Sequence, residues 1–227
     1  MKSFLRKIKN LAYKVLGSKI EEIYWRFRHI FNKDWAEKYV SEDSLNSPPR
    51  QLLINSVSKY APFDSVFEVG CASGPNLYLL AKKFPQAKIY GSDISKEAIN
   101  FGKRYFEEQK IKNVEFFHNQ AEKSFKNFAD KSIDIIFSDA TLIYLDQKKI
   151  TATIKEMFRV GRKALIFVEW HTELPSSIFD DHWIHNYRNL LTKFISSEKI
   201  KFTKIPENIL AGNWAKYGYI IEVNLEK

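Results

Sequence analysis

Cysteine and long apolar runs are both scarce in this chain. Its 227 residues include one cysteine, Cys71. A single thiol forms neither an intramolecular disulfide nor a cysteine-based metal site, and such scarcity is typical of a reducing compartment. No run of about 18 apolar residues is present, so no membrane-spanning helix is expected. The first residues also lack the apolar core and cleavage site of a secretory signal. We therefore expect a cytoplasmic location.

The net charge of +9 is unevenly distributed along the chain. Residues 1–33 contain nine lysines and arginines against Glu21 and Glu22, so they carry most of the excess. The remaining residues are close to neutral. A basic surface over the whole protein, as nucleic-acid binding would need, is therefore not expected, and we predict no nucleic-acid partner.

The N-terminal segment has the pattern of an amphipathic helix. Its apolar residues fall on one helical face, with most lysines elsewhere, and they are Phe4, Leu5, Ile8, Leu11, Ala12, Val15 and Leu16. Such a helix either packs as a cap on the core or lies, through residues 1–20, on the anionic inner face of a membrane. A mitochondrial transit peptide is a third alternative. Ser47-Pro48-Pro49 marks a boundary, so we predict a basic helical extension over 1–50 and a separate main domain over 51–227.

Short apolar runs alternate with helical patterns from residue 52 onward. Strands are predicted at 65–69, 88–91, 114–117, 133–138 and 164–169, and helices at 76–84, 95–109, 146–161 and 185–197. Two closing strands, at 200–205 and 217–224, have no helix-length segment between them, so they should pair antiparallel. Ser95 suits a helix N-cap, and Gly161 suits a left-handed C-terminal cap. The pattern predicts an α/β fold with a Rossmann-like, seven-stranded, mostly parallel sheet and an antiparallel last strand.

The segment between the first predicted strand and helix contains two glycines. Gly70 and Gly74 allow a sharp turn and a close approach of the backbone to a ligand. Their spacing, Gly-x-x-x-Gly, differs from the dinucleotide fingerprint Gly-x-Gly-x-x-Gly. Pro75 removes a backbone donor that a phosphate could use, and the carboxylate of Glu68 would repel a phosphate. The loop therefore favours a ligand that carries cationic groups.

Four segments, in this order, resemble the motifs of class I S-adenosylmethionine-dependent methyltransferases. The run Glu68-Val69-Gly70-Cys71-Ala72-Ser73-Gly74 is similar to the first motif, with Ala72 at the position of the middle glycine. Asp93 stands where the family has an acid at the end of the second strand. Residues 117–122 and 133–142 resemble the segments beside the adenine and the methyl donor, and Asn119 or Gln120 replaces the usual aspartate.

The resemblance covers about residues 52–225 and implies S-adenosylmethionine as the cofactor. It also implies that Asp93 accepts hydrogen bonds from both ribose hydroxyls. Cys71 is interpreted as a small apolar filler whose backbone meets the ligand. The predicted cofactor-binding residues are Glu68, Gly70, Cys71, Ala72, Gly74, Asn76, Asp93, Ile94, Asn119, Gln120, Ala121 and Asp139.

Methyl transfer from a sulfonium depends mainly on placing the acceptor in line with the carbon–sulfur bond. A hydroxyl acceptor also benefits from a general base. We predict catalytic roles for His171, which follows the fifth strand, and for Asp139 and Tyr144 after the fourth. Plain turn or packing roles are the alternatives, and His182 and His185 are further candidate bases. The scattered histidines show no metal-ligand spacing, so no metal is expected.

The acceptor is predicted mostly by elimination. After the fourth strand the chain has Ser138-Asp139-Ala140-Thr141, where enzymes that methylate base amines carry an Asn/Asp-Pro-Pro-aromatic run. The layout resembles bacterial small-molecule and saccharide methyltransferases, including those of polysaccharide biosynthesis. We therefore predict O-methylation of a small-molecule or saccharide acceptor, including lipid-linked ones. A nicotinamide-dependent oxidoreductase and a non-catalytic cofactor-binding protein are the alternatives, and the oligomeric state is left open.

Overall fold

The computed structural model describes residues 19–226, apart from the side chains of His29 and Phe31. The predicted amphipathic helix and membrane contact of residues 1–20 lie outside the described residues, except for Lys19 and Ile20. Within the described part of the chain, no helix combines the length and apolarity needed to cross a bilayer.

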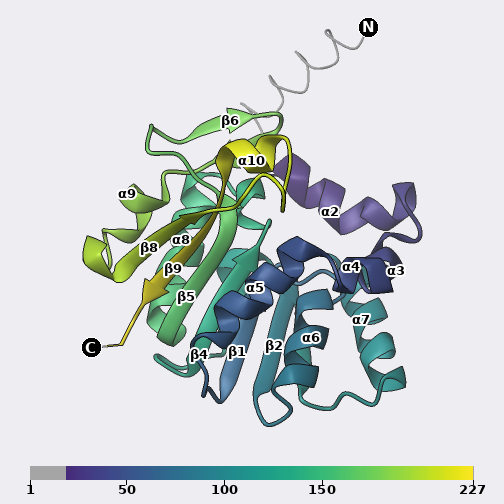
Figure 1. Ribbon diagram of the computed structural model, residues 1–227. Helices are drawn as coiled ribbons and strands as arrows, with labels where there is room; N and C mark the ends of the chain where they lie inside the picture. The colour runs from purple at the N-terminus through teal and green to yellow at the C-terminus, as the bar shows by residue number, and fades with distance from the viewer. Residues whose placement is uncertain (1–18, 227) are drawn as a thin grey trace, which may run out of the picture.

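Seven strands form one sheet in the order β3-β2-β1-β4-β5-β9-β8 (Figure 1). They are β1 (Ser65–Val69), β2 (Lys88–Asp93), β3 (Val114–His118), β4 (Ile133–Asp139), β5 (Gly161–Trp170), β8 (Ile200–Lys204) and β9 (Gly218–Asn224). The first five pair in parallel, and β9 lies antiparallel between β5 and β8. The predicted Rossmann-like α/β fold, with its antiparallel last strand, is confirmed.

Helices cover both faces of the sheet (Figure 1). They are α2 (Lys19–Phe31), α3 (Trp35–Tyr39), α4 (Glu42–Leu45), α5 (Pro48–Ser58), α6 (Pro75–Lys83), α7 (Lys96–Glu108), α8 (Gln147–Val160), α9 (Tyr187–Leu191) and α10 (Asn213–Tyr217). On one face α5, α6 and α7 bury apolar side chains such as Leu53, Leu77 and Ile99. On the other face α8 and α9 bury Met157 and Tyr187.

Strand ends place the loops that matter for binding. The strand β1 pairs with β2 on one side and β4 on the other. The strands β2 and β3 are added on one side of β1 and the later strands on the other side, so the order of strands reverses between β1 and β4. In open α/β sheets, ligands bind beyond the carboxyl ends of the strands at such a switch point. Every residue of β1 is buried, so the strand is fixed in the core up to the loop that begins at Gly70.

Local signals fix several element boundaries. The Ser95 side chain accepts a hydrogen bond from the Ala98 amide and caps α7, as predicted. Asp146 caps α8 by accepting from the Lys148 and Lys149 amides. Ser47 occupies the N-cap position of α5, whose first turn contains two prolines, and the predicted division between residues 50 and 51 falls inside this helix.

Two local predictions are wrong. Gly161 does not form the predicted left-handed cap: its φ is −69°, because α8 leads directly into β5. A Cβ built on Gly161 would lie 2.8 Å from the Met157 carbonyl oxygen, so the missing side chain leaves room for this carbonyl. The helix predicted at 185–197 is limited to α9. Just before it, residues 182–184, for which no element was predicted, are extended. They form β7 (His182–Ile184), which pairs with β6 (Ser177–Phe179) in a hairpin. Backbone bonds from His185 to Trp170 and Thr172 hold this segment against the end of β5.

Candidate active site

The loop after β1 is held in a tight turn. Gly70 (φ 78°), Ala72 (φ 49°) and Gly74 (φ 86°) all have left-handed backbone conformations. The Ala72 amide donates to Asp93 Oδ2 at 2.8 Å, which ties this turn to the end of β2. A Cβ built on Gly70 would lie 2.1 Å from Thr141 Oγ1 on the loop after β4. The three loops are therefore packed tightly around one space.

That space is a cavity of about 330 Å³ at the carboxyl ends of β1, β2 and β4. Eleven of the twelve predicted cofactor-binding residues line it: Glu68, Gly70, Cys71, Ala72, Asn76, Asp93, Ile94, Asn119, Gln120, Ala121 and Asp139. Gly74 does not; its Cα faces Phe116, whose ring would lie 2.7 Å from a built Cβ. The structure therefore brings the four motif segments together, with Gly74 in a packing position.

The cavity is rich in carboxylates. Burial raises the pKa of Glu68 well above its usual range, and burial also raises the pKa values of Asp93 and Asp139. Glu68 Oε1 accepts a hydrogen bond from Asn76 Nδ2 at 2.6 Å, whereas Oε2 has no partner among the described residues. Carboxylates held in this way are stabilised in their charged form by a bound cation. The site therefore suits a ligand with positive charge.

One arginine enters the same cavity from α5. Arg50 Nη1 donates to Asn76 Oδ1 at 2.6 Å, and its Nε donates to the Ser44 carbonyl at 2.9 Å. Asn76 thus connects the guanidinium to Glu68 and, at 3.2 Å, to Asp139. Sequence reasoning missed Arg50, because nothing in its neighbourhood in the chain distinguishes it from a solvated helix residue.

The helix α2 forms one wall of the cavity. Glu22 Oε2 accepts from Gln120 Nε2 at 2.9 Å, and Glu22 also forms an ion pair with Lys149 of α8. The Trp25 ring packs edge-on against Tyr144, with ring centroids 5.1 Å apart. Glu21, Glu22, Trp25 and Tyr39 all line the cavity, and none of them was predicted as a site residue.

A buried glutamate shapes the loop after β4. The carboxylate of Glu169 in β5 accepts hydrogen bonds from the Thr141 and Leu142 amides at 3.0 Å and from the Ile143 amide at 3.2 Å. Burial raises the pKa of Glu169 to about 7, although the Leu142 and Thr141 amides oppose the shift. The three bonds fix the turn that brings Tyr144 to the cavity. Sequence reasoning treated Glu169 only as part of a strand.

Asp139 and Tyr144, two of the predicted catalytic residues, both line the cavity. Burial raises the pKa of the Tyr144 phenol, so it stays neutral and can act as a hydrogen-bond donor or an aromatic wall. Asp139 accepts from Asn76, and the raised pKa of its carboxyl makes the ionised form a stronger base than a solvated aspartate.

A model of the methyltransferase domain family matches residues 63–221, more than half of the chain. The chain belongs to this methyltransferase family. The match runs from just before β1 into β9, so it contains the loops after β1, β2 and β4. The finding agrees with the family resemblance of the four motif segments.

The methyltransferase domain is similar to several known proteins. A tRNA (guanine-N(7)-)-methyltransferase of Lactobacillus gasseri is 28% identical over 111 residues, which is 47% of this chain and 51% of the relative. A trans-aconitate 2-methyltransferase of Rhodopseudomonas palustris is 33% identical over 161 residues, 67% of this chain and 59% of the relative. The structure of magnesium protoporphyrin IX methyltransferase from Synechocystis PCC 6803 matches with a TM-score of 0.62 at 17% identity, covering 92% and 97% of the two chains.

The chain spans about half, or less, of the length of the first curated relatives. The structural likeness, at this low identity, confirms the fold of the methyltransferase domain. The comparisons also support S-adenosylmethionine as its cofactor. The cavity fits this molecule in charge, because its carboxylates suit a sulfonium and an ammonium, and Arg50 suits a carboxylate.

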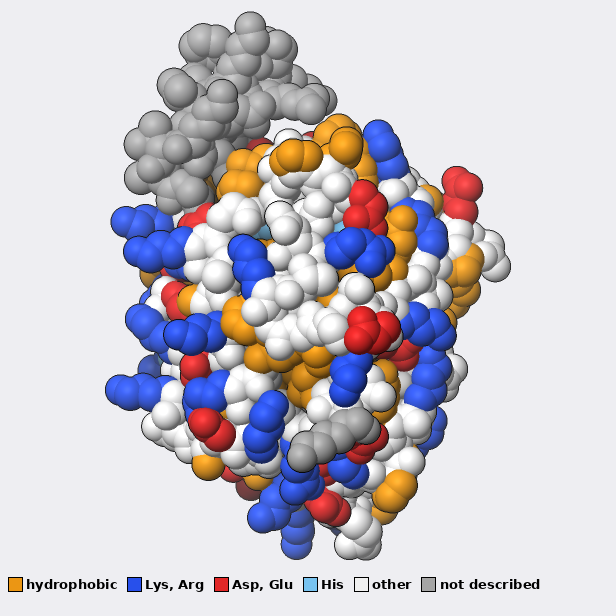
Figure 2. Space-filling view, turned by 90° about the vertical axis from the view of Figure 1, so that its left-hand side faces the viewer, with side chains coloured by type: hydrophobic (Ala, Val, Ile, Leu, Met, Phe, Trp, Pro, Cys, Tyr) orange, Lys and Arg blue, Asp and Glu red, His pale blue; other side chains and the backbone are white. Residues whose placement is uncertain are grey.

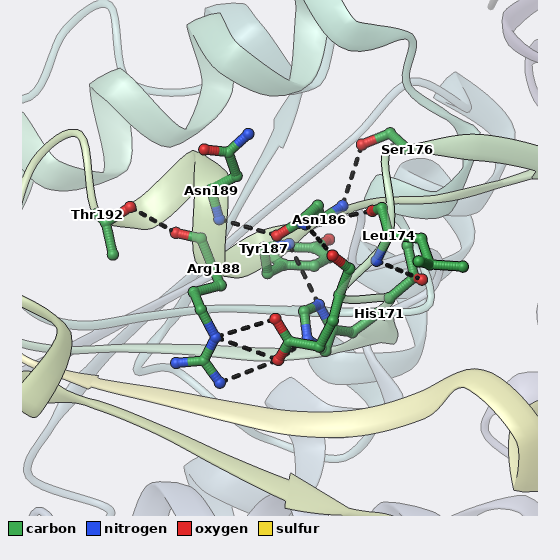
Figure 3. Close-up of polar contacts among 10 residues, drawn as sticks. His171, Leu174, Ser176, Asn186, Tyr187, Arg188, Asn189 and Thr192 are labelled. Carbon is green, nitrogen blue, oxygen red and sulfur yellow. Dashed lines mark hydrogen bonds and ion pairs between the residues drawn. The ribbon is translucent and has the colours of Figure 1, made fainter.

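His171 is not among the residues that line the cavity of the methyltransferase domain, and Figure 3 shows the polar contacts that surround it instead. Its Nδ1 accepts from the Tyr187 amide at 3.2 Å, and its Nε2 lies 3.2 Å from Glu173 Oε1. Glu173 is held in turn by Arg188, whose Nε and Nη2 donate to it at 3.0–3.1 Å. Burial lowers the pKa of His171. Both ring nitrogens are engaged, so the geometry does not support the predicted role as a base.

The other two candidate bases also lie outside the cavity lining. His185 is fully buried between Gln147 and the Leu142 carbonyl, and burial lowers its pKa to about 4. Because the Gln147 amide nitrogen donates to Nδ1, Nε2 carries the proton and donates to Leu142. His182 packs behind Tyr144, with ring centroids 5.1 Å apart. These histidines support the loop that carries Tyr144.

Cys71 is buried beside Gly91, where a built Cβ would lie 2.8 Å from its sulfur. Burial raises the pKa of the thiol well above its usual range, which suits an apolar filler and not a nucleophile. Among residues 19–226, no group of three or more histidine, cysteine, aspartate and glutamate side chains is arranged to hold a metal ion.

Proposed function

We propose that this methyltransferase transfers a methyl group from S-adenosylmethionine to a hydroxyl group of a small-molecule or saccharide acceptor. One observation carries the proposal. A single cavity contains the carboxylates and arginine that suit the cofactor and, from α2, α3 and the loop after β4, the aromatic side chains of Trp25, Tyr39 and Tyr144. The aromatic part gives an acceptor a place beside the cofactor.

In this proposal the residues around the β1 loop hold the amino-acid part of the cofactor. Arg50 pairs with its carboxylate, while Glu68 and Asp139 attract its positive charges. The carboxylate oxygens of Asp93 accept from the ribose hydroxyls, in addition to the Ala72 and Ser95 amides that already hold them. The backbone of the 70–72 turn approaches the ligand closely, and residues 94 and 119–121 surround the adenine.

The bound cofactor supplies an activated methyl group, so the protein mainly has to orient the acceptor. Positioning of this kind is worth up to roughly 7–11 kcal/mol in favourable systems. Asp139 receives the proton of the acceptor hydroxyl, and Tyr144 borders the acceptor and orients it through its neutral phenol. Glu169 acts as a positioning residue, because its three backbone hydrogen bonds fix the turn between Asp139 and Tyr144.

Side-chain chemistry on the α2 side of the cavity supports a saccharide acceptor. The rings of Trp25 and Tyr144 offer apolar faces, and Glu21 and Glu22 lie beside them. Sugar rings present apolar faces that stack on aromatic side chains and hydroxyls that donate to carboxylates. A cytoplasmic location, which the single cysteine supports, remains part of this proposal, as does a place in polysaccharide biosynthesis.

Two measurements test the proposal. Thermal shift should show stabilisation by S-adenosylhomocysteine and none by NAD; stabilisation by NAD alone would favour an oxidoreductase. Mass spectrometry of small metabolites, lipid-linked glycans and tRNA, incubated with the protein and cofactor, should then find one added methyl group in a metabolite or glycan. Methylation confined to tRNA would overturn the proposed acceptor class. Asp139→Asn should suppress the product even when S-adenosylmethionine is saturating, beyond any loss of cofactor affinity.

A further inference from the structure

The outer face of α2 exposes large apolar side chains to solvent. Ile23 and Ile30 are each 60% exposed, and Tyr24 and Phe27 are each more than 40% exposed. The spacing of Ile23, Phe27 and Ile30 places them on one line along the helix. A soluble helix normally turns such a line toward the core. Here the core-facing side is occupied by other residues.

Acidic and basic side chains lie on different sides of α2. Glu21, Glu22 and Trp25 face the cavity. Lys19 and Arg26 are exposed, and because seven residues separate them, almost two full turns, they lie along the same side next to the apolar line. The acidic residues of α2 are thus turned inward, and the outward side presents apolar and basic groups.

A second apolar element lies near α2. Leu174 is 71% exposed just before the β6–β7 hairpin, and Ile178 and Phe179 of β6 are each 40% exposed. The Trp25 ring contacts Tyr144, which contacts His182 of β7, so α2 and the hairpin flank one side chain. Figure 1 shows both elements in the upper part of the molecule, and Figure 2, which views the side opposite α2, shows hydrophobic side chains at the upper end.

We propose that the outward side of α2, together with Leu174, Ile178 and Phe179, docks the protein on an anionic lipid surface. Exposed bulky apolar groups flanked by basic side chains are the chemistry of helices that lie in a membrane interface. The turn of the hairpin carries Asp180 and Asp181, so α2 supplies the electrostatic attraction and the hairpin supplies apolar contact only. Of the large apolar side chains exposed among residues 19–226, only Phe194 lies elsewhere.

Docking in this way would hold the wall of the cavity at the lipid surface, within reach of a lipid-linked acceptor. That consequence rests on the proposed function. The docking itself does not, because the surface lies outside the cavity and needs neither cofactor nor acceptor. Loss of vesicle binding and loss of cofactor binding can therefore be measured separately, and a protein that methylates nothing could still dock.

The apolar contact is tested by sedimentation of the full-length chain with phosphatidylglycerol vesicles. The triple substitution Ile23→Gln, Phe27→Gln and Ile30→Gln keeps good helix formers on α2 and should weaken vesicle binding by about tenfold or more. The matched control, Phe194→Gln, removes an exposed aromatic elsewhere and should leave binding unchanged. Circular dichroism and the affinity for S-adenosylhomocysteine should be the same in all variants, which shows that the cavity is intact.

Two double variants test the contribution of charge to vesicle binding. Lys19→Gln with Arg26→Gln should weaken binding to phosphatidylglycerol vesicles and reduce its salt dependence. Lys96→Gln with Lys103→Gln removes two exposed lysines at the same spacing on α7 and should have no such effect. Equal binding by the α2 variants and the controls would overturn the proposal. So would a protein that ignores vesicles but forms a dimer that the triple substitution dissociates, because a second copy would then cover this face.

Discussion

Two polar regions at the same edge of the sheet differ in how their groups are satisfied. At the ends of β1, β2 and β4, Glu68, Asp93 and Asp139 surround an open cavity, and Glu68 Oε2 has no partner among the described residues. At the end of β5, both ring nitrogens of His171 are engaged and Glu173 is clamped by Arg188. The first region is built to receive a ligand, and the second is already complete.

The difference shows that position at a strand end is not enough to identify a functional residue. Buried polar groups in proteins are normally paired, so an under-satisfied carboxylate in a cavity marks a place where a ligand completes the pairing. A buried histidine whose two ring nitrogens both have hydrogen-bond partners does not mark such a place. Substitutions that separate the two regions, from the largest expected effect to the smallest, sharpen this comparison.

Glu68→Gln should have the largest effect. Glutamine keeps the shape of the side chain and the acceptor for Asn76 but removes the charge that faces the ligand. The affinity for S-adenosylhomocysteine should fall by about 2–4 kcal/mol, roughly 30- to 900-fold, as expected for the loss of a buried charge partner. Calorimetric titration measures it. An unchanged dissociation constant would remove Glu68 from the binding site.

Glu169→Gln should change the pH dependence of stability. Burial raises the pKa of Glu169 from 4.5 to about 7, so the folded state binds the proton more tightly than the unfolded state. The contribution of this group to the free energy of unfolding therefore falls as pH rises from about 4.5 to 7, by about 3 kcal/mol in total. Denaturant unfolding across this range should show that the variant lacks the decline. A parallel pH profile in both proteins would contradict this account.

Gly70→Ala tests the close contact between the loops after β1 and β4. A Cβ would meet Thr141 at 2.1 Å, in addition to the strain of alanine at φ 78°. Gly212→Ala is a control for a positive φ without a steric neighbour, because Gly212 has φ 64° and nothing within 4 Å of a built Cβ. Gly70→Ala should lower the free energy of unfolding by about 2 kcal/mol more than the control. Equal losses would mean that the loops separate easily.

His171→Phe should have the smallest effect and a purely structural one. The ring is retained, but the Tyr187 amide loses its acceptor, so the free energy of unfolding should fall by about 1–2 kcal/mol. Affinity for S-adenosylhomocysteine and methyl transfer by the folded protein should be unchanged. Loss of methyl transfer without loss of stability would restore His171 as the general base.

The sheet and the cofactor loops could be predicted from the sequence because their signals are local. β1 was predicted with the observed bounds, and Glu68 and Asp93 reach the cavity because strand ends fix them at one edge. Ser95 marked the start of α7 for the same reason. Hydrophobic runs, capping residues and glycines determine the structure of the few residues around them, so they can be recognised in a single sequence.

The other wall of the cavity could not be predicted, because it depends on packing between distant segments. Trp25 and Arg50 reach the cavity only after α2 and α5 lie over the sheet edge, and neither carries a local mark of that placement. His171 misled for the opposite reason. It follows a strand as Gly70 does, but β5 lies beyond β4 from the switch point, and the 172–187 segment covers its end.

The central claim is that the cavity beyond β1, β2 and β4 binds the adenosyl cofactor through its carboxylates. Calorimetric titration of S-adenosylmethionine, which carries both the sulfonium and the ammonium, into the full-length protein, in two buffers that differ in ionisation enthalpy, tests it directly. Burial raises the pKa values of Glu68, Asp93 and Asp139, and a cationic ligand favours their ionised forms. We predict saturable binding at one site with net release of protons to the buffer. Absence of binding, or binding with proton uptake, would contradict the account.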